Sequence, residues 1–428
     1  MSETPAAAAP APTPRRSFAA LHHQGYRRYF ITSALAMMGD SIEHVISYWI
    51  IFQKFHSPAL GGFAILSHWL PFLFFGVLSG ALADRYDPRR LVQIGMVLFA
   101  LCSVAWGVLF LTDSLQMWHA LVILTLHGMA GVFWGTPGQV LLYDMVGKDL
   151  LPSAVRLNST SRVLGQLGGP AIGGIILIVF GPAHGILINV LSFLPLAFFL
   201  WKAPYGPKFQ KVQRPPRPIR GLSEIVGTMK SIKGNRIIVS MILLASCSSA
   251  FVASGYQAQM PNFALDLGHG DAGFFYSMLL GANAVGALTA GFVLEATGLM
   301  LPRPITPFVL VILWCGVLIC FALTSTYALA VGLMVVAGFL GLSYDSMNTT
   351  LVQLNAPTEI RGRVIGLYNM FSQGFRAFSG ITIGVGGSFV GVHWSLAGSA
   401  AMLLIAASLL FYRIRPSLAA IGPTARVS

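Results

Sequence analysis

The chain has 428 residues, of which 55% are hydrophobic and only 10% are charged, and its mean hydropathy is +0.72. A soluble protein of this length cannot hide so much apolar surface behind so few charges, so the composition excludes a soluble enzyme, a disordered chain and a fibrous repeat. The formal net charge of +13 would suit a nucleic-acid partner if the basic residues formed one patch, but in a membrane protein its meaning depends on where they lie.

The N-terminal segment is rich in Ala and Pro and then becomes basic. It lacks the order of a secretory signal, which has a charged start, a short apolar core and a cleavage site. We therefore predict a disordered cytoplasmic tail over residues 1–28, followed by a first hydrophobic helix that stays in the protein.

Apolar segments then follow one another with short links, and each is close to the roughly 20 residues that a membrane helix needs. The predicted spans are 29–52, 61–83, 91–111, 117–142, 155–180, 185–201, 237–258, 272–296, 305–323, 327–351, 364–390 and 392–412. They form an N-terminal bundle over 29–201 and a C-terminal bundle over 237–412. The sequence thus predicts an all-α membrane protein with twelve transmembrane helices in two six-helix bundles.

Basic residues lie almost entirely on one side of these spans. With a cytoplasmic N-terminus, the inner loops, the linker and both tails carry nearly every Lys and Arg, and the outer loops carry only Lys54. Because Lys and Arg are enriched in cytoplasmic loops, we predict that both termini are cytoplasmic, including a tail over 413–428. The charge of +13 is then a topology signal, and no nucleic-acid partner is expected.

The linker between the bundles, residues 202–236, is rich in Lys, Arg and Pro. Leu222, Ile225, Val226, Met229 and Ile232 have the spacing of an amphipathic helix. We predict a cytoplasmic loop whose helix lies on the membrane surface; a regulatory or partner-binding segment is the alternative.

The first span contains ionisable residues. Asp40, Glu43 and His44 share one helix face, and Asp40 lies roughly 18 Å along the helix from its basic start. A charge at that depth costs about 2.5–3.5 kcal/mol on insertion scales, so it should face the bundle interior or water. Two coupled carboxyl groups beside an imidazole suit a proton carrier with two states; a structural hydrogen-bonded cluster is the alternative.

Other polar residues lie inside later spans. Asp345 and Asn348 share a face of the tenth span, and Arg376 lies in the eleventh, where it either pairs with an acid across a cavity or binds an anionic group. His68 and His127, in the second and fourth spans, are expected to be satisfied by packing. The residues that could line an aromatic cavity, if they do not simply pack or face lipid, are Trp49, Trp134, Tyr256, Gln257 and Phe371.

The two halves resemble each other at an offset of about 210 residues. Residues 80–84 follow the second span and residues 291–295 follow the eighth, so that Glu295 takes the place of Asp84. A duplicated six-helix unit is typical of transporters that bind substrate near the membrane midplane, between the halves.

The loop after the second span reads GALADRYDPRR over residues 80–90. It resembles the loop motif between helices two and three of the major facilitator superfamily, with Asp87 where the family has a second glycine. The motif residues are Gly80, Asp84, Arg85, Arg89 and Arg90. The resemblance implies a cytoplasmic gate in which Asp84 accepts backbone N–H bonds at the start of the eleventh span, near Val364; the alternative is charge that only sets topology.

The fifth span reads GQLGGPAIGG over residues 165–174, which fits the motif that the superfamily associates with antiporters. Its positions are Gly165, Gly169, Pro170, Gly173 and Gly174. This motif and the segment 357–364 resemble the branch of siderophore and drug exporters. Generic close packing of small residues is the alternative.

Neither an ATP-binding signature nor a CxxC or Cys/His cluster occurs in the sequence, so we expect no cofactor, no metal and no enzymatic activity. The intramembrane acids favour protons over sodium as the coupling ion. Taken with the resemblance, they predict a monomeric, proton-coupled exporter of an amphipathic small molecule, such as a siderophore or drug, that contacts lipid in the bacterial inner membrane. The alternatives are a lipid-moving or metabolite uptake carrier of the same fold and a non-transporting sensor.

Overall fold

The computed structural model describes residues 17–55, 58–206, 221, 223–253, 255–267, 272–298, 300–379, 382–383 and 386–420. Within these residues the chain forms helices and no strands. Eight helical segments of this described part are long and apolar enough to cross a membrane. The predicted tail residues 1–16 and 421–428, and residues 207–220 and 222 of the predicted linker, lie outside the described residues.

The N-terminal bundle follows the predicted spans, with two departures at glycine. Its elements are η1 (Ala19–His22), α1 (Gln24–Phe55), α2 (Pro58–Arg85), α3 (Pro88–Leu111), α4 (Met117–Asn189), η2 (Val190–Ser192) and α5 (Leu194–Lys202). The long α4 breaks at Gly147 and Gly181, whose φ angles of 71° and 72° favour glycine. These breaks let one continuous element contribute three successive segments to the bundle.

The C-terminal half begins after a short linker helix. Its elements are α6 (Ser223–Ile232), α7 (Arg236–Phe251), α8 (Gly255–Ala258), α9 (Met260–Asp266), α10 (Ala272–Thr297), α11 (Thr306–Leu323), α12 (Tyr327–Asn355), η4 (Thr358–Ile360), α13 (Arg361–Asn369), η5 (Met370–Gly374), α14 (Arg376–Ser379), α15 (Gly386–Val390) and α16 (Val392–Ala420). The predicted eleventh span is interrupted by the π-helical turn η5, a kind of irregularity that often lies at functional sites.

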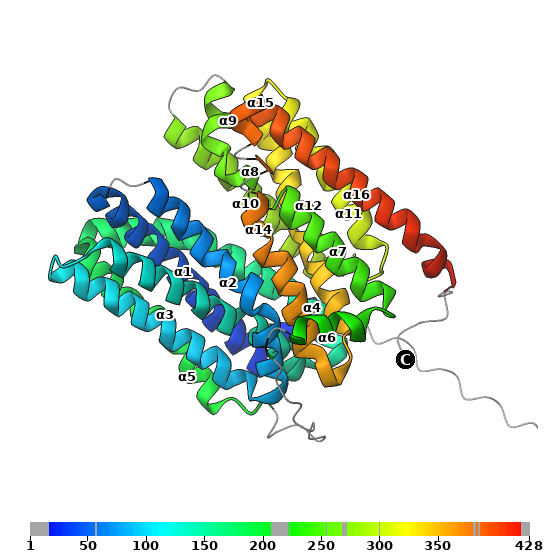
Figure 1. Cartoon of the computed structure of the whole chain (residues 1–428), viewed down its shortest axis with the longest axis horizontal. Helices are drawn as coiled ribbons and strands as arrows, with labels where there is room; N and C mark the ends of the chain where they lie inside the picture. Colours follow the sequence, from blue (N-terminus) through cyan, green and yellow to red (C-terminus); the bar gives the residue numbers. More distant parts are fainter. Residues whose placement is uncertain are drawn as a thin grey trace, which may run out of the picture.

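The two bundles meet at one end and diverge at the other (Figure 1). Where they meet, α2 packs against α13 and α4 packs against α10, and α6 contacts α2 and α13. We call this the closed end, and the opposite end the divergent end. The closed end carries the loop after α2 and the linker helix, which are the segments predicted to be cytoplasmic.

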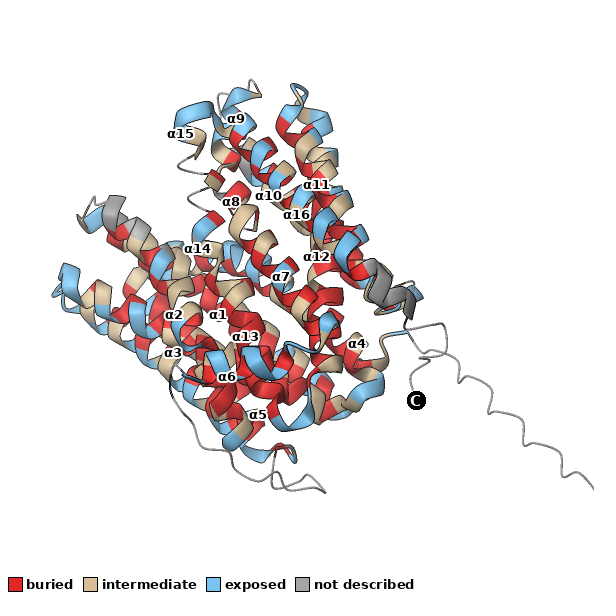
Figure 2. Ribbon diagram, turned by 45° about the vertical axis from the view of Figure 1, so that its right-hand side comes forward, coloured by how far each residue is buried: buried red, intermediate tan, exposed pale blue. Residues whose placement is uncertain are grey.

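Buried residues concentrate where helices face one another, and exposed residues cover the outer faces (Figure 2). Many of these exposed residues are large and apolar; Ile178 and Phe389, for example, are 85% and 82% exposed. Contiguous apolar surface of this kind requires a nonpolar environment, which agrees with the composition.

Both ends of the helical region extend further than predicted. Residues 17–28 are not a disordered tail: α1 begins at Gln24, and Ala20 and Tyr26 are buried. The Ser17 hydroxyl donates to the Ala296 carbonyl at 2.6 Å, so contacts with the C-terminal half hold this segment. At the other end α16 continues to Ala420, well into the predicted tail.

The linker helix α6 forms as predicted, and the side that packs against the rest of the protein includes polar residues. Glu224, Thr228 and Ile232 are buried, while Val226 and Met229 are exposed. Glu224 accepts a hydrogen bond from Arg363 Nε at 2.7 Å, and this ion pair draws the polar side of the helix against α13.

Candidate functional site

A network of carboxylates and one imidazole lies inside the N-terminal bundle. His127, from α4, is hydrogen bonded through Nε2 to Asp40 Oδ1 at 2.8 Å and through Nδ1 to Glu43 Oε1 at 2.9 Å. The Ser103 hydroxyl, from α3, donates to the other oxygen of Glu43. Asp40, Glu43 and His127 are all at least nine-tenths buried. Three helices thus hold one imidazole between two acids.

The group formed by Asp40, His127 and Glu43 can keep its hydrogen bonds in two protonation states. An imidazolium can donate to both carboxylates at once, which leaves the group with one net negative charge. One further proton on either carboxylate makes the group neutral. Because a buried charge is costly, the addition of one proton removes the cost of the group's net negative charge.

His44 and His68 complete the surroundings of Asp40. His44 Nδ1 lies 3.8 Å from Asp40 Oδ2, and the His44 ring lies 4.9 Å from the His68 ring and 4.8 Å from the His127 ring. Asp40, His44, His68 and His127 each offer a ligand atom, and these atoms lie within 4.8 Å of one another, as a metal site would need. Both nitrogens of His127 are already bonded to carboxylates, however, so the observed geometry is that of a hydrogen-bonded network.

His127, which was expected to be satisfied by packing, is buried and is satisfied by hydrogen bonds to two carboxylates. The sequence did place Asp40 and Glu43 on one face of α1, but it paired them with His44 from the same helix. His127 lies about 15 Å into its span, counted from Met117, and an ionisable residue at that depth is by default a functional candidate. That depth was the available signal.

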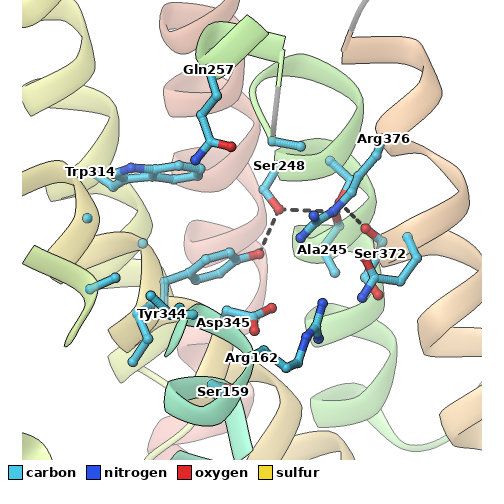
Figure 3. Close-up of a pocket in the computed structure, with 18 of the residues that line it drawn as sticks. Ser159, Arg162, Ala245, Ser248, Gln257, Trp314, Tyr344, Asp345, Ser372 and Arg376 are labelled. Atoms are coloured by element: carbon cyan, nitrogen blue, oxygen red, sulfur yellow. Dashed lines mark hydrogen bonds between the residues drawn. The ribbon is translucent and has the colours of Figure 1, made fainter. Parts of the chain in front are cut away.

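A cavity of about 450 Å³ lies between the two halves (Figure 3). Arg162 of α4, Asp345 of α12 and Arg376 of α14 all point into it. The Arg376 guanidinium lies 4.9 Å from the centre of the Trp69 ring, and its Nε has no hydrogen-bond partner among the described residues. The predicted residues Asp345 and Arg376 therefore share one cavity, and Arg162, which was not singled out from the sequence, joins them.

Aromatic residues form one wall of this cavity. The rings of Trp314 and Tyr344 stack with centroids 6.2 Å apart, and the Tyr344 hydroxyl is 2.9 Å from Ser248 Oγ. Of the aromatic and amide candidates, Tyr256 and Gln257 line this cavity.

Three other predicted lining residues lie elsewhere. Asn348 is fully buried outside the cavity and donates to the Met241 carbonyl at 3.2 Å, so it joins α12 to α7. Trp49 is 48% exposed near the end of α1, and Phe371 packs against Phe375 with ring centroids 5.0 Å apart. Helical spacing in the sequence shows which residues share a face, but it does not show whether that face lines a cavity or packs against another helix.

A smaller cavity of about 100 Å³ connects the acid network to the central cavity. Asp40, His68 and Trp134 line it. Trp69, Arg162, Gln166 and Gln373 line both cavities. Asp40 therefore lines a cavity that shares four side chains with the central cavity.

At the closed end, Asp84 binds the start of α13. Its carboxylate accepts the Gly362 N–H at 2.6 Å and the Arg363 N–H at 3.0 Å, and Arg363 Nη1 lies 3.4 Å from Oδ2. This is the contact expected from the sequence motif. A carboxylate at a helix N-terminus satisfies free N–H groups and favours the helix dipole.

The three arginines of this motif contact residues of the N-terminal half, while Gly80 lies at the contact with the C-terminal half. Arg89 is buried, pairs with Asp87 at 2.5 Å and donates to the Ala203 carbonyl. Arg85 and Arg90 are exposed and stack over Tyr86 and Trp201. Gly80 contacts the backbone of Gly362 so closely that a methyl group there would overlap the Gly362 carbonyl oxygen.

A second ion pair forms at Glu295, the position in the C-terminal half that corresponds to Asp84 in the sequence repeat. Glu295, at the end of α10, accepts from Arg156 Nε at 2.8 Å and also from the Ser153 hydroxyl. Both partners lie just after the Gly147 break in α4. The two halves thus contribute matching acidic residues, Asp84 and Glu295, that hold the closed end together.

The glycine motif of α4 packs against the helix that carries Asp40. A methyl group at Gly165 would meet Met37 and Met38, and one at Gly169 would overlap Ser41. Gly173 faces Ile42, while Pro170 is exposed and Gly174 has open space beside it. These glycines therefore allow the close approach that positions the acid network.

Gly169→Ala is expected to lower the midpoint of thermal unfolding, because a clash in a packed interior costs about 1–3 kcal/mol. Gly174→Ala is the matched control, since nothing lies within 4 Å of its added methyl group. Thermal unfolding of the two purified variants in one detergent measures the difference. Equal midpoints would contradict the packing described for Gly169.

Comparisons with known proteins agree with this architecture. A family model described as transmembrane secretion effector matches residues 15–424. The staphyloferrin A transporter of Staphylococcus aureus is 28% identical over 188 residues, which are 41% of this chain and 46% of that protein. The match therefore spans about half the length of that relative. The enterobactin exporter EntS of Shigella dysenteriae is 23% identical over 305 residues, 69% of each chain.

Solved structures show the same fold. The proton:xylose symporter XylE superposes with a TM-score of 0.71 at 13% identity, over 93% of this chain and 99% of that chain. The human organic anion transporter MFSD10 has a TM-score of 0.69 at 12% identity, over 90% and 99%. An outward-facing bacterial homologue of ferroportin has a TM-score of 0.68 at 14% identity, over 92% and 99%.

Proposed function

Since this chain belongs to the transmembrane secretion effector family of major facilitator superfamily transporters, we propose that it exports an amphipathic small molecule, such as a siderophore or a drug, in exchange for protons. Like the other members of that family, it is an integral multi-pass membrane protein. The observation that carries the proposal is the pair of adjoining cavities, one lined by Asp40 and the other lying between the two halves.

Alternating access is supported by the contrast between the two ends of the molecule. Asp84 and Glu295 hold the closed end, and the bundles part toward the divergent end (Figure 1). We infer that the closed end is cytoplasmic, with twelve spans and both termini inside, because the basic loops gather there. Rocking of the two halves would then break these ion pairs and open the cavity to the cytoplasm.

Proton coupling is supported by the acid network. A proton that enters from the divergent side neutralises the Asp40–His127–Glu43 group and so changes the charge beside the shared wall of the two cavities. The glycine motif next to this group and the relationship to an enterobactin exporter favour export across the bacterial inner membrane.

The test is a strain that lacks the gene, profiled for secreted metabolites and for drug sensitivity. We expect at least one amphipathic compound to accumulate inside the cells. Everted membrane vesicles should then take up that compound only when a proton gradient is present. Unchanged levels of every compound would contradict transport, and accumulation by intact cells against the gradient would show uptake in place of export.

A further inference from the structure

The central cavity contains more positive charge than its own residues neutralise. Two arginines and one aspartate line it, so its formal charge is +1. Neither Arg162 nor Arg376 forms an ion pair within 4.0 Å of a carboxylate among the described residues. Arg376 rests on the face of Trp69, and its buried Nε has no acceptor. Guanidinium groups that line a cavity bind anions through charge-assisted hydrogen bonds, so the lining of this cavity suits an anionic group.

The two arginines come from opposite halves of the protein. Arg162 belongs to α4 in the N-terminal bundle and Arg376 to α14 in the C-terminal half, and both reach the same space (Figure 3). Like charges that face each other across a cavity repel, and an anion between them removes the repulsion. A planar carboxylate suits this position because guanidinium groups bind it through two parallel hydrogen bonds.

We propose that the transported molecule of this protein carries an anionic group that binds between Arg162 and Arg376, with an aromatic or apolar body against Trp314 and Tyr344. This inference rests on the proposed function and specifies its substrate class. Asp345 partly offsets the arginines, so the site takes a single negative charge in preference to several. The anion joins the two halves, and its binding therefore favours their approach.

Equilibrium binding to the purified protein tests this proposal without any ion gradient. The probes are naphthalene-2-carboxylate, its neutral carboxamide and 2-naphthylmethylammonium, which share one aromatic body and differ in charge. We expect the carboxylate to bind about tenfold more tightly than the carboxamide, a difference of about 1.4 kcal/mol, because hydrogen bonds to charged groups are stronger than those to neutral groups. The ammonium should bind least.

Variants of the arginines and of the aspartate should change the affinity for the carboxylate in opposite directions. Arg162→Gln and Arg376→Gln should each remove the preference for the carboxylate, and Arg376→Lys should retain part of it, because Lys keeps the charge without the planar fork. Asp345→Asn should raise carboxylate affinity, which a merely structural role would not do. Arg303→Gln, an exposed arginine in the loop before α11, is the control and should change nothing.

Equal binding of carboxylate and carboxamide by the unmodified protein would overturn the proposal, as would tighter binding of the ammonium or no binding of the carboxylate. Because no gradient is applied, these outcomes are independent of proton coupling. Carboxylate binding without proton-driven transport would instead contradict only the proposed coupling.

Discussion

Asp40→Asn is expected to reduce proton-driven export strongly while substrate exchange without a gradient persists. Asn keeps the size and hydrogen-bonding capacity of the side chain beside His127, but it cannot take up a proton. Coupling between two ligands is typically worth 1–3 kcal/mol, so accumulation driven by the gradient should fall by about 10- to 100-fold. Transport and exchange of the compound found in the deletion strain, measured in proteoliposomes, separate the two activities.

Asp113→Asn is the control for this variant. Asp113 is exposed at the divergent end, where its Oδ1 lies 2.6 Å from Lys54 Nζ, and an exposed pair contributes little. Full proton-driven transport by Asp40→Asn would show that this carboxylate is not the carrier. A parallel loss of exchange and of folded protein would mean that the network is structural, and thermal unfolding distinguishes that result.

Gly80→Val should shift the protein toward a state in which the closed end is open. The added side chain would overlap the Gly362 carbonyl, so α2 and α13 must separate, and the bonds from Asp84 to the start of α13 would lengthen. A small-to-large change at such a contact costs about 1–3 kcal/mol, enough to change the ratio of the two states by about five- to a hundredfold.

The measurement is the reactivity of a single cysteine at the closed end. In a chain without its four native cysteines, Val140→Cys places a thiol in the cluster formed with Ile365, where Val140 is only 1% exposed. Everted vesicles should label this thiol with an impermeant maleimide several-fold faster in the Gly80→Val background. Gly316→Val, with open space beside it, should leave the rate unchanged. Equal rates in both backgrounds would refute a gating role for this contact.

Local patterns were enough to identify the parts of the site that lie on one helix. Asp40 and Glu43 are three residues apart on α1, and helical periodicity places them on one face. The sequence motif likewise identified Asp84 and the start of α13 as partners. Each of these inferences needs only a short stretch of chain, or a resemblance in which the pairing is already recorded.

The missed residues share a different property. His127 is 87 positions from Asp40 in the sequence, and Arg162 meets Arg376 only because α4 and α14 reach one cavity from opposite halves. Asn348 has the same helical spacing from Asp345 as a cavity residue would have, yet it faces α7. No pattern within one helix specifies which neighbouring helix its polar face will meet.

The sequence by itself determined that this protein is an integral membrane protein, because the transfer of each apolar segment from water to lipid depends on that segment alone. Its motifs at residues 80–90 and 165–174 identified the major facilitator superfamily by resemblance. Only the tertiary structure decided which of the ionisable residues inside the bundles are hydrogen bonded to one another and which line the central cavity. A buried charge must be satisfied by whatever group packing brings within about 3 Å, and packing joins helices that are remote along the chain.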